Sequence, residues 1–171
     1  MSNTIVYEDR SKRFDENMIK GRIAETIVEQ MFIRMGYDIY RYGMENTVPG
    51  IIQDLYNCKP KEVSDEIRKM PDFIIKNPND NSVYYVEVKF RADGKFLLKE
   101  LGKNYPYKNA YILVVSKKHI RCVLYSELEE SGELLMKKEY LLGYREDFKT
   151  NREIILYFCE LAKKYFSCLE S

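Results

Sequence analysis

Apolar residues recur at helical spacing in two long stretches of the chain. In residues 14–35 they return every three or four positions, and Gly36 follows where a glycine often ends a helix. In residues 151–169 the same spacing returns near the end of the chain. The pattern predicts two amphipathic helices, and the mostly polar residues before the first predict a loosely docked N-terminal arm over residues 1–13.

Strand patterns and shorter helical patterns fill the chain between these two helices. Strands are predicted where residues alternate or form short apolar runs, at residues 37–42, 110–116 and 119–125. Short helices are predicted at residues 61–69, 95–103 and 127–139, the last broken near Gly132. Residues 51–56 fit either one helical turn or a short strand.

The most informative stretch is residues 70–91, in which two alternating strands flank a polar turn at residues 77–82. A symmetric turn pairs Asp72 with Glu87, Phe73 with Val86, and Ile75 with Tyr84. Because side chains alternate across a strand, Asp72, Glu87 and Lys89 share one face of this hairpin. The whole order of elements predicts an α/β fold in three layers, a mixed sheet of about five strands flanked by helices, in a single domain over residues 1–171.

Two carboxylates at one spot of a hairpin need a positive charge between them. Cross-strand partners have Cβ atoms about 4.5–5.5 Å apart, and like charges at that separation are destabilising. Oxygen ligands of this kind suit a hard divalent cation such as Mg²⁺ or Mn²⁺. Lys89, two residues beyond Glu87 on the same face, is placed to orient a metal-bound water or to lower its pKa. The pattern outlines a hydrolytic site.

Glu25 is a third candidate carboxylate. Projection of the first predicted helix places Glu25 inside one margin of its apolar arc. A carboxylate that faces inward costs free energy unless something pairs with it. The pattern is compatible with two alternatives for Glu25, a pairing with Arg22 and a role at the predicted metal site.

The composition of the chain limits which binding partners and which cellular location we expect. The 28 basic residues are balanced by 27 acidic ones, so any nucleic-acid contact has to come from a local patch. Zinc-ligand spacing is absent, because His119 is the only histidine and the four cysteines are scattered, at Cys58, Cys122, Cys159 and Cys168. The sequence shows neither a signal-peptide pattern nor a membrane-spanning run, so we expect a cytoplasmic protein with no membrane partner.

A basic stretch with interleaved aromatic residues follows the hairpin. Its predicted phosphate-binding side chains are Arg91, Lys95, Lys99, Lys103 and Lys108. The alternative is an ordinary helix face whose lysines lie in water.

These residues resemble a known signature. Pro71 and Asp72, followed fifteen residues later by Glu87, Val88 and Lys89, resemble the PD-(D/E)XK motif of the restriction-endonuclease-like nucleases. A helix that carries Gly21 and Glu25 and ends at Gly36 is similar to the first helix of many members, including the archaeal-type Holliday-junction resolvases.

The resemblance implies a restriction-endonuclease-like core and a role for each polar residue. Asp72, Glu87 and the backbone carbonyl of Val88 would ligate Mg²⁺ or Mn²⁺, and Lys89 would position or deprotonate the attacking water. Glu25 would bind a second metal or a water of the first. The implied activity is metal-dependent hydrolysis of phosphodiester bonds.

The leading hypothesis is therefore a metal-dependent DNA endonuclease, in its sharper form one that cleaves branched DNA as a symmetric dimer. The alternative is a catalytically silent module of the same fold that binds nucleic acid or serves in assembly. A third interpretation is a structural protein in which Asp72 and Glu87 are ordinary strand-edge charges. Because the net charge is close to zero, we expect a homodimer or a partner subunit to enlarge the binding surface.

Overall fold

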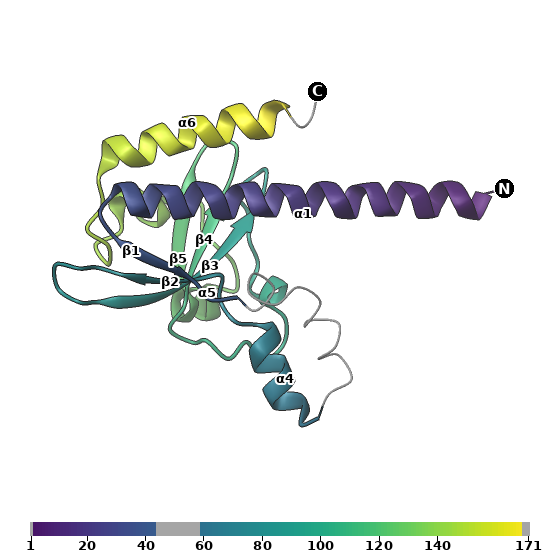
Figure 1. The fold of residues 1–171 in the computed structure, drawn as a ribbon, viewed down its shortest axis with the longest axis horizontal. Coiled ribbons are helices and arrows are strands. Elements are labelled where there is room, and N and C mark those ends of the chain that lie inside the picture. The colour runs from purple at the N-terminus through teal and green to yellow at the C-terminus, as the bar shows by residue number, and fades with distance from the viewer. Residues whose placement is uncertain (1, 44–58, 169–171) are drawn as a thin grey trace.

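A five-stranded sheet forms the middle layer of the molecule (Figure 1). The computed structural model describes residues 2–43 and 59–168, with the backbone alone for residues 2–11. The strands lie in the order β1 (Asp38–Arg41), β2 (Phe73–Lys76), β3 (Val83–Phe90), β4 (Tyr111–Val115) and β5 (Ile120–Leu124). Neighbouring strands are antiparallel except for the parallel pair β3 and β4. The predicted mixed sheet of about five strands is confirmed.

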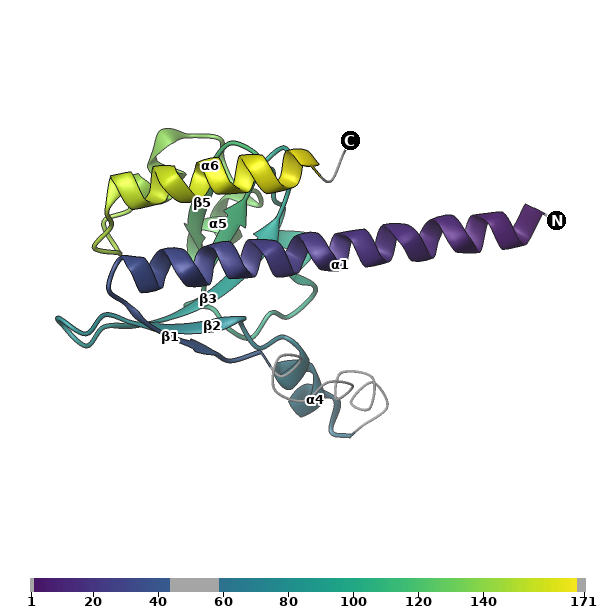
Figure 2. The same cartoon turned by 45° about the horizontal axis from the view of Figure 1, so that its top comes forward.

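Each face of the sheet is covered by its own apolar layer. The helices α1 (Ser2–Arg34) and α6 (Arg152–Cys168) lie side by side on one face with opposite chain directions (Figures 1 and 2). Their core includes the strand residues Val86 and Val88. On the other face, α5 (Tyr125–Ser131) and the segment after β3 form a second cluster that includes Ile112 and Val114. The three-layer α/β architecture is as predicted.

Shorter elements connect these layers. The predicted short helix at residues 61–69 is α4 (Lys61–Arg68), which leads directly into the hairpin. The helix predicted after residue 127 is α5, and Gly132 ends it in the left-handed conformation with φ 72°. Two 3-10 turns, η2 (Lys138–Tyr140) and η3 (Leu142–Tyr144), then lead to α6. The turn or strand predicted at residues 51–56 lies outside the described residues.

The first helix is longer than its apolar pattern predicts. The pattern predicted a start at Phe14 after a polar arm, but α1 begins at Ser2. No proline or glycine lies between Ser2 and Lys20, and extending an existing helix costs far less than starting one. The N-terminal half of α1 therefore projects beyond the sheet as a helix (Figures 1 and 2). In the part of the chain that the structure describes, neither α1 nor any other helix is both long and apolar enough to cross a membrane.

The helix predicted at residues 95–103 is wrong except for one 3-10 turn, η1 (Leu98–Leu101). Leu97 is extended and forms an isolated antiparallel bridge with Glu133. Phe96 and Leu101 are both buried in the second cluster. An α-helix would carry these two side chains on different sides, so tertiary packing overrides the local helical pattern.

A core substitution in α1 tests this packing. Met31 is fully buried between the helix layer and the sheet, whereas the neighbouring Gln30 is exposed. Met31→Ala should lower the free energy of unfolding by about 2–5 kcal/mol, because it leaves a cavity in the core. The matched change Gln30→Ala should stay within about 0.5 kcal/mol. Urea denaturation followed by circular dichroism measures both, and equal effects of the two changes would contradict this placement of α1.

Candidate functional site

The hairpin has the register that its sequence pattern predicts. The observed pairs include Phe73 with Val86 and Ile75 with Tyr84. Asp72 stands immediately before β2, and its Oδ2 accepts a hydrogen bond of 2.7 Å from the backbone N–H of Val88. The carbonyl oxygen of Asp72 accepts the N–H of Tyr42 at 2.9 Å. Asp72 is thus held from both sides, by the strand β3 and by the chain that follows β1.

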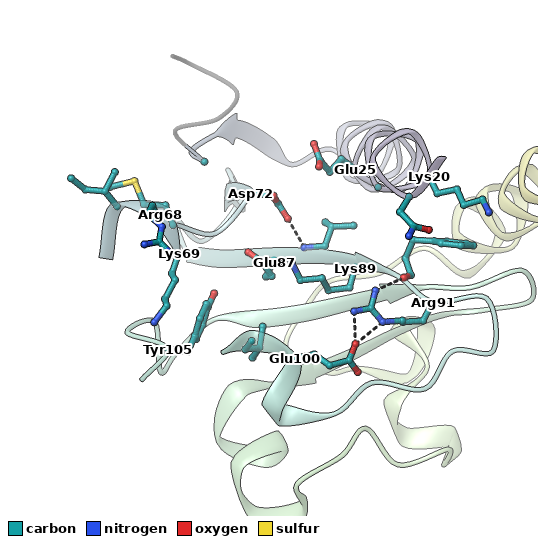
Figure 3. Close-up of a pocket in the computed structure, with 18 of the residues that line it drawn as sticks. Lys20, Glu25, Arg68, Lys69, Asp72, Glu87, Lys89, Arg91, Glu100 and Tyr105 are labelled. Atoms are coloured by element: carbon teal, nitrogen blue, oxygen red, sulfur yellow. Dashed lines mark hydrogen bonds and ion pairs between the residues drawn. The ribbon is translucent and has the colours of Figure 1, made fainter. Parts of the chain in front are cut away.

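Glu87 and Lys89 project from β3 on the face opposite Val86 and Val88. This follows from strand alternation, because the two valines pack in the core beneath α1 and α6. The Nζ of Lys89 lies 2.5 Å from Oε1 of Glu87. Glu25, Asp72 and Glu87 are each only 8% exposed. Figure 3 shows Asp72 and Glu87 close to each other at the middle of the site.

The electrostatics of the site follow from this burial. Burial raises the pKa of Asp72 well above its usual range, and the nearby carboxylate of Glu87 raises it further. Burial alone would lower the pKa of Lys89, but the carboxylates of Glu87 and Asp72 outweigh it, so the pKa of Lys89 is raised. Asp72 therefore resists ionisation in the absence of a further cation, and Lys89 holds its proton.

The backbone carbonyl of Val88 belongs to the same edge of the hairpin. If the register of β2 and β3 continued by two residues, Val88 would face Pro71. Proline has no backbone N–H, so Pro71 cannot donate a ladder hydrogen bond to this carbonyl. In an antiparallel pair of strands, the N–H and the C=O of one residue point toward the same neighbouring strand. The N–H of Val88 points to Asp72. By this geometry the carbonyl oxygen lies on the side of β3 that faces Asp72.

The donor atoms at this edge fit a hard divalent cation. In residues 2–43 and 59–168, no group of three or more His, Cys, Asp or Glu side chains is arranged to hold a metal ion. The oxygen donors that could hold a cation at this edge are the Asp72 and Glu87 carboxylates and the Val88 carbonyl, with water completing the ligand set. One or two carboxylates with several waters is the ligand set that Mg²⁺ prefers in proteins.

Glu25 lines the same region from α1 but is engaged by arginines. Its Oε2 lies 3.2 Å from Nη1 of Arg22 and 3.7 Å from Nη1 of Arg41. Arg41 also makes a two-pronged contact with Glu29, at 2.6 and 3.0 Å. The predicted pairing with Arg22 is present, and Arg41 is a second partner that the sequence pattern did not indicate.

One cleft of about 870 Å³ brings all four predicted polar residues together. Glu25, Asp72, Glu87 and Lys89 line it together with a set of basic side chains, namely Lys20, Arg68, Lys69 and Arg91. Figure 3 shows that these basic residues come from α1, from the end of α4 and from the chain after β3. The cleft thus has an acidic floor and a basic rim.

The predicted basic stretch contributes only in part to this rim. Of its five residues, Arg91 lines the cleft, where it pairs with Glu100. Lys95, Lys99 and Lys103 are exposed but do not line it. Lys108 donates instead to the Tyr125 hydroxyl at 2.7 Å and to Glu129 at 3.3 Å. Their predicted contact with nucleic acid therefore has to be made outside the cleft.

Sequence reasoning missed Lys20, Arg68 and Lys69 as lining residues. A signal for the last two was present, because Lys69 stands only two residues before Pro71 in the signature. Lys20 stands five residues before Glu25, so it lies more than one helical turn further along α1.

Comparison of the chain with family models, with curated proteins and with solved structures finds no match.

The raised pKa of Asp72 predicts that Asp72→Asn stabilises the metal-free protein. Because the pKa of Asp72 is raised in the folded state, the cost to stability is complete above that pKa. The cost shrinks as the pH falls through the folded-state pKa and is gone below the ordinary pKa of aspartate in the unfolded chain. Asparagine keeps an oxygen that can accept the Val88 N–H. We expect the melting temperature at pH 7 to rise by about 2–4 °C, which corresponds to about 1 kcal/mol for a chain of this length. The gain should shrink as the pH is lowered.

Asp38→Asn, at an exposed position of β1, is the matched control and should leave the melting temperature unchanged. Differential scanning calorimetry in a chelating buffer measures both variants. A lower melting temperature for Asp72→Asn would show that the buried carboxylate stabilises the fold.

Proposed function

We propose that this chain is a metal-dependent endonuclease that hydrolyses phosphodiester bonds in DNA. The observation that carries the proposal is the convergence of Asp72, Glu87 and Lys89 on the floor of one cleft with a basic rim. The resemblance of these residues to the PD-(D/E)XK signature supports the same activity. We place the chain in that superfamily as part of the proposal.

Asp72, Glu87 and the Val88 carbonyl are the proposed ligands of Mg²⁺ or Mn²⁺. The bound cation would act as a Lewis acid toward the phosphate and would make a coordinated water more acidic. Glu25 lines the cleft at its α1 side and is proposed to hold a further water or a second cation when Arg22 or Arg41 releases it.

Lys89 is proposed to act through its positive charge. Its pKa is raised, so it carries a proton at neutral pH and is unsuited to remove one from water. A protonated Lys89 can orient the attacking water by donating a hydrogen bond, and it can stabilise negative charge that develops on the phosphate. In-line attack forms a bond between the water oxygen and phosphorus and breaks the bond from phosphorus to the leaving oxygen. The attacking water gives one proton to solvent, and the leaving oxygen takes one proton from solvent.

The basic rim is proposed to hold the nucleic-acid backbone. Lys20, Lys69 and Arg91 lie around the acidic floor, where they can neutralise phosphates on either side of the bond that is cleaved. Without such cations an acidic floor would repel DNA. This arrangement explains how a chain of almost zero net charge can bind a polyanion.

A homodimer or a partner subunit remains part of the proposal. The projecting helix α1 exposes Phe14, Met18 and Ile19, and an apolar groove on α1 is bordered by Tyr165 of α6. Apolar side chains gathered in this way are typical of protein interfaces. The buried cysteines Cys122 and Cys159 form no disulfide bond, which fits the proposed cytoplasmic location.

The alternative proposal is a catalytically silent module that binds nucleic acid or serves in assembly. The observation in its favour is that Glu25 and Glu87 already have cationic partners, in Arg22, Arg41 and Lys89. Such pairing neutralises the cleft without a metal. The two proposals differ in whether a divalent cation binds at Asp72.

Cleavage assays test the proposed chemistry. With Mg²⁺ or Mn²⁺, the wild-type chain should cleave at least one substrate in a panel of linear, single-stranded, flapped and four-way DNA. Glu87→Gln and Lys89→Met should each lower the rate at least about 100-fold, because each removes a group from the reacting centre. Lys118→Met, at an exposed position away from the cleft, should cleave at the wild-type rate. Wild-type activity in both site variants would refute the proposed roles.

Metal binding is tested separately by melting the protein with and without Mn²⁺. A cation that binds only the folded chain at 100 times its Kd adds about 2.7 kcal/mol, which raises the melting temperature by about 5–10 °C. Asp72→Asn should lose this rise although it is itself more stable without metal. Isothermal titration with Mn²⁺ gives the affinity directly. A wild-type chain with no Asp72-dependent binding would favour the silent module.

A further inference from the structure

Tyr105 is a buried residue of the cleft whose hydroxyl has no hydrogen-bond partner. It is 3% exposed, and its oxygen is one of only two buried side-chain polar atoms without a partner in the described part of the chain. Tyr105 also lines the 870 Å³ cleft. In Figure 3 its hydroxyl points up into the cleft, toward the region between Lys69 and Glu87. Buried polar atoms are normally satisfied, so this one calls for an explanation.

The ring of Tyr105 is held without any use of the hydroxyl. It stacks on Tyr125, with ring centroids 5.6 Å apart and an interplanar angle of 20°, and it contacts Tyr107 at 5.9 Å. The preceding backbone is fixed by Lys69, whose Nζ donates to the carbonyl of Lys103 at 2.6 Å. The hydroxyl is therefore positioned by packing alone, as a preorganised donor would be.

The surroundings also determine what this hydroxyl can bind. Burial, with the nearby carboxylates of Glu87 and Asp72, raises the pKa of Tyr105, so the hydroxyl stays protonated and can donate. The ammonium group of Lys69 lies on the same side of the cleft (Figure 3). A neutral donor beside a cation, across from a candidate metal site, suits an anionic oxygen.

We propose that the Tyr105 hydroxyl donates a hydrogen bond to a non-bridging oxygen of the phosphodiester that is cleaved, with Lys69 as the neighbouring cation. This inference rests on the proposed nuclease function and adds to it a residue that contacts the substrate. In the protein without substrate the donor has no acceptor, which explains why it is unpaired.

Tyr105→Phe tests the proposal because it removes the hydroxyl and keeps the ring. The melting temperature should be unchanged or higher, since the variant removes an unsatisfied polar atom from a buried position. The cleavage rate at saturating DNA should fall about 10- to 100-fold, and the affinity for DNA in a chelating buffer about 3- to 10-fold.

Tyr125→Phe is the matched control, because that hydroxyl is paired with Lys108 and Glu129. It should lower the melting temperature and leave cleavage unchanged. The two variants should therefore show opposite patterns of stability and activity.

Replacing one oxygen of the scissile phosphate by sulfur tests whether Tyr105 contacts that oxygen. A purely structural role of Tyr105 would leave the effect of the sulfur unchanged. Sulfur is a weak hydrogen-bond acceptor. Replacing the contacted oxygen should slow the wild-type chain, whereas Tyr105→Phe should show little additional loss for that same stereoisomer. An unchanged sulfur effect in Tyr105→Phe, or normal cleavage by this variant beside an active wild type, would overturn the inference and leave the nuclease proposal standing. A wild-type chain with no metal-dependent cleavage of any DNA in the panel would overturn both.

Discussion

The closeness of Asp72 and Glu87 is the constraint on which the rest of the site depends. Burial disfavours the ionised form of Asp72, and repulsion by the nearby carboxylate of Glu87 adds to this cost, so the pKa of Asp72 is raised. The surrounding groups lessen it, since Lys89 contacts Glu87 and the Val88 N–H donates to Asp72. Perturbed pKa values of this kind gather at functional sites of proteins.

The sheet keeps these groups in place. β3 lies in the centre of the strand order, and its first half pairs antiparallel with β2. Its second half, from which Glu87 and Lys89 project, pairs parallel with β4. On the opposite face, Val86 and Val88 pack beneath α1 and α6. This packing holds in place the backbone of β3, from which Glu87 projects. A rigid strand with one apolar face and one charged face is therefore both the scaffold and the carrier of the site.

Groups of different charge occupy different parts of the cleft. The floor is acidic, the rim is basic, and Tyr105 adds a neutral donor on the side of Lys69. Glu25 is already paired with Arg22 and Arg41. Of the carboxylates that line the cleft, it is therefore the one whose binding to a cation depends on the release of these arginines. The site can thus exist in a compensated state without a cation, and a cation would compete with lysine and arginine for the carboxylates.

The local periodicity of the sequence determined the register of the hairpin and the two faces of β3. The period of two residues in the hairpin was enough to pair Phe73 with Val86 and to separate the valine face from the charged face, because a shift of one residue would bury the charges. Tertiary structure alone decided which features lie close in space but far apart along the chain. It extended the backbone at Leu97 and buried Phe96, and it brought Arg41 to Glu25. It also placed Lys69 along the cleft and Lys108 beside Tyr125. Those outcomes depend on how helices and loops pack across the sheet, which no spacing along the sequence encodes.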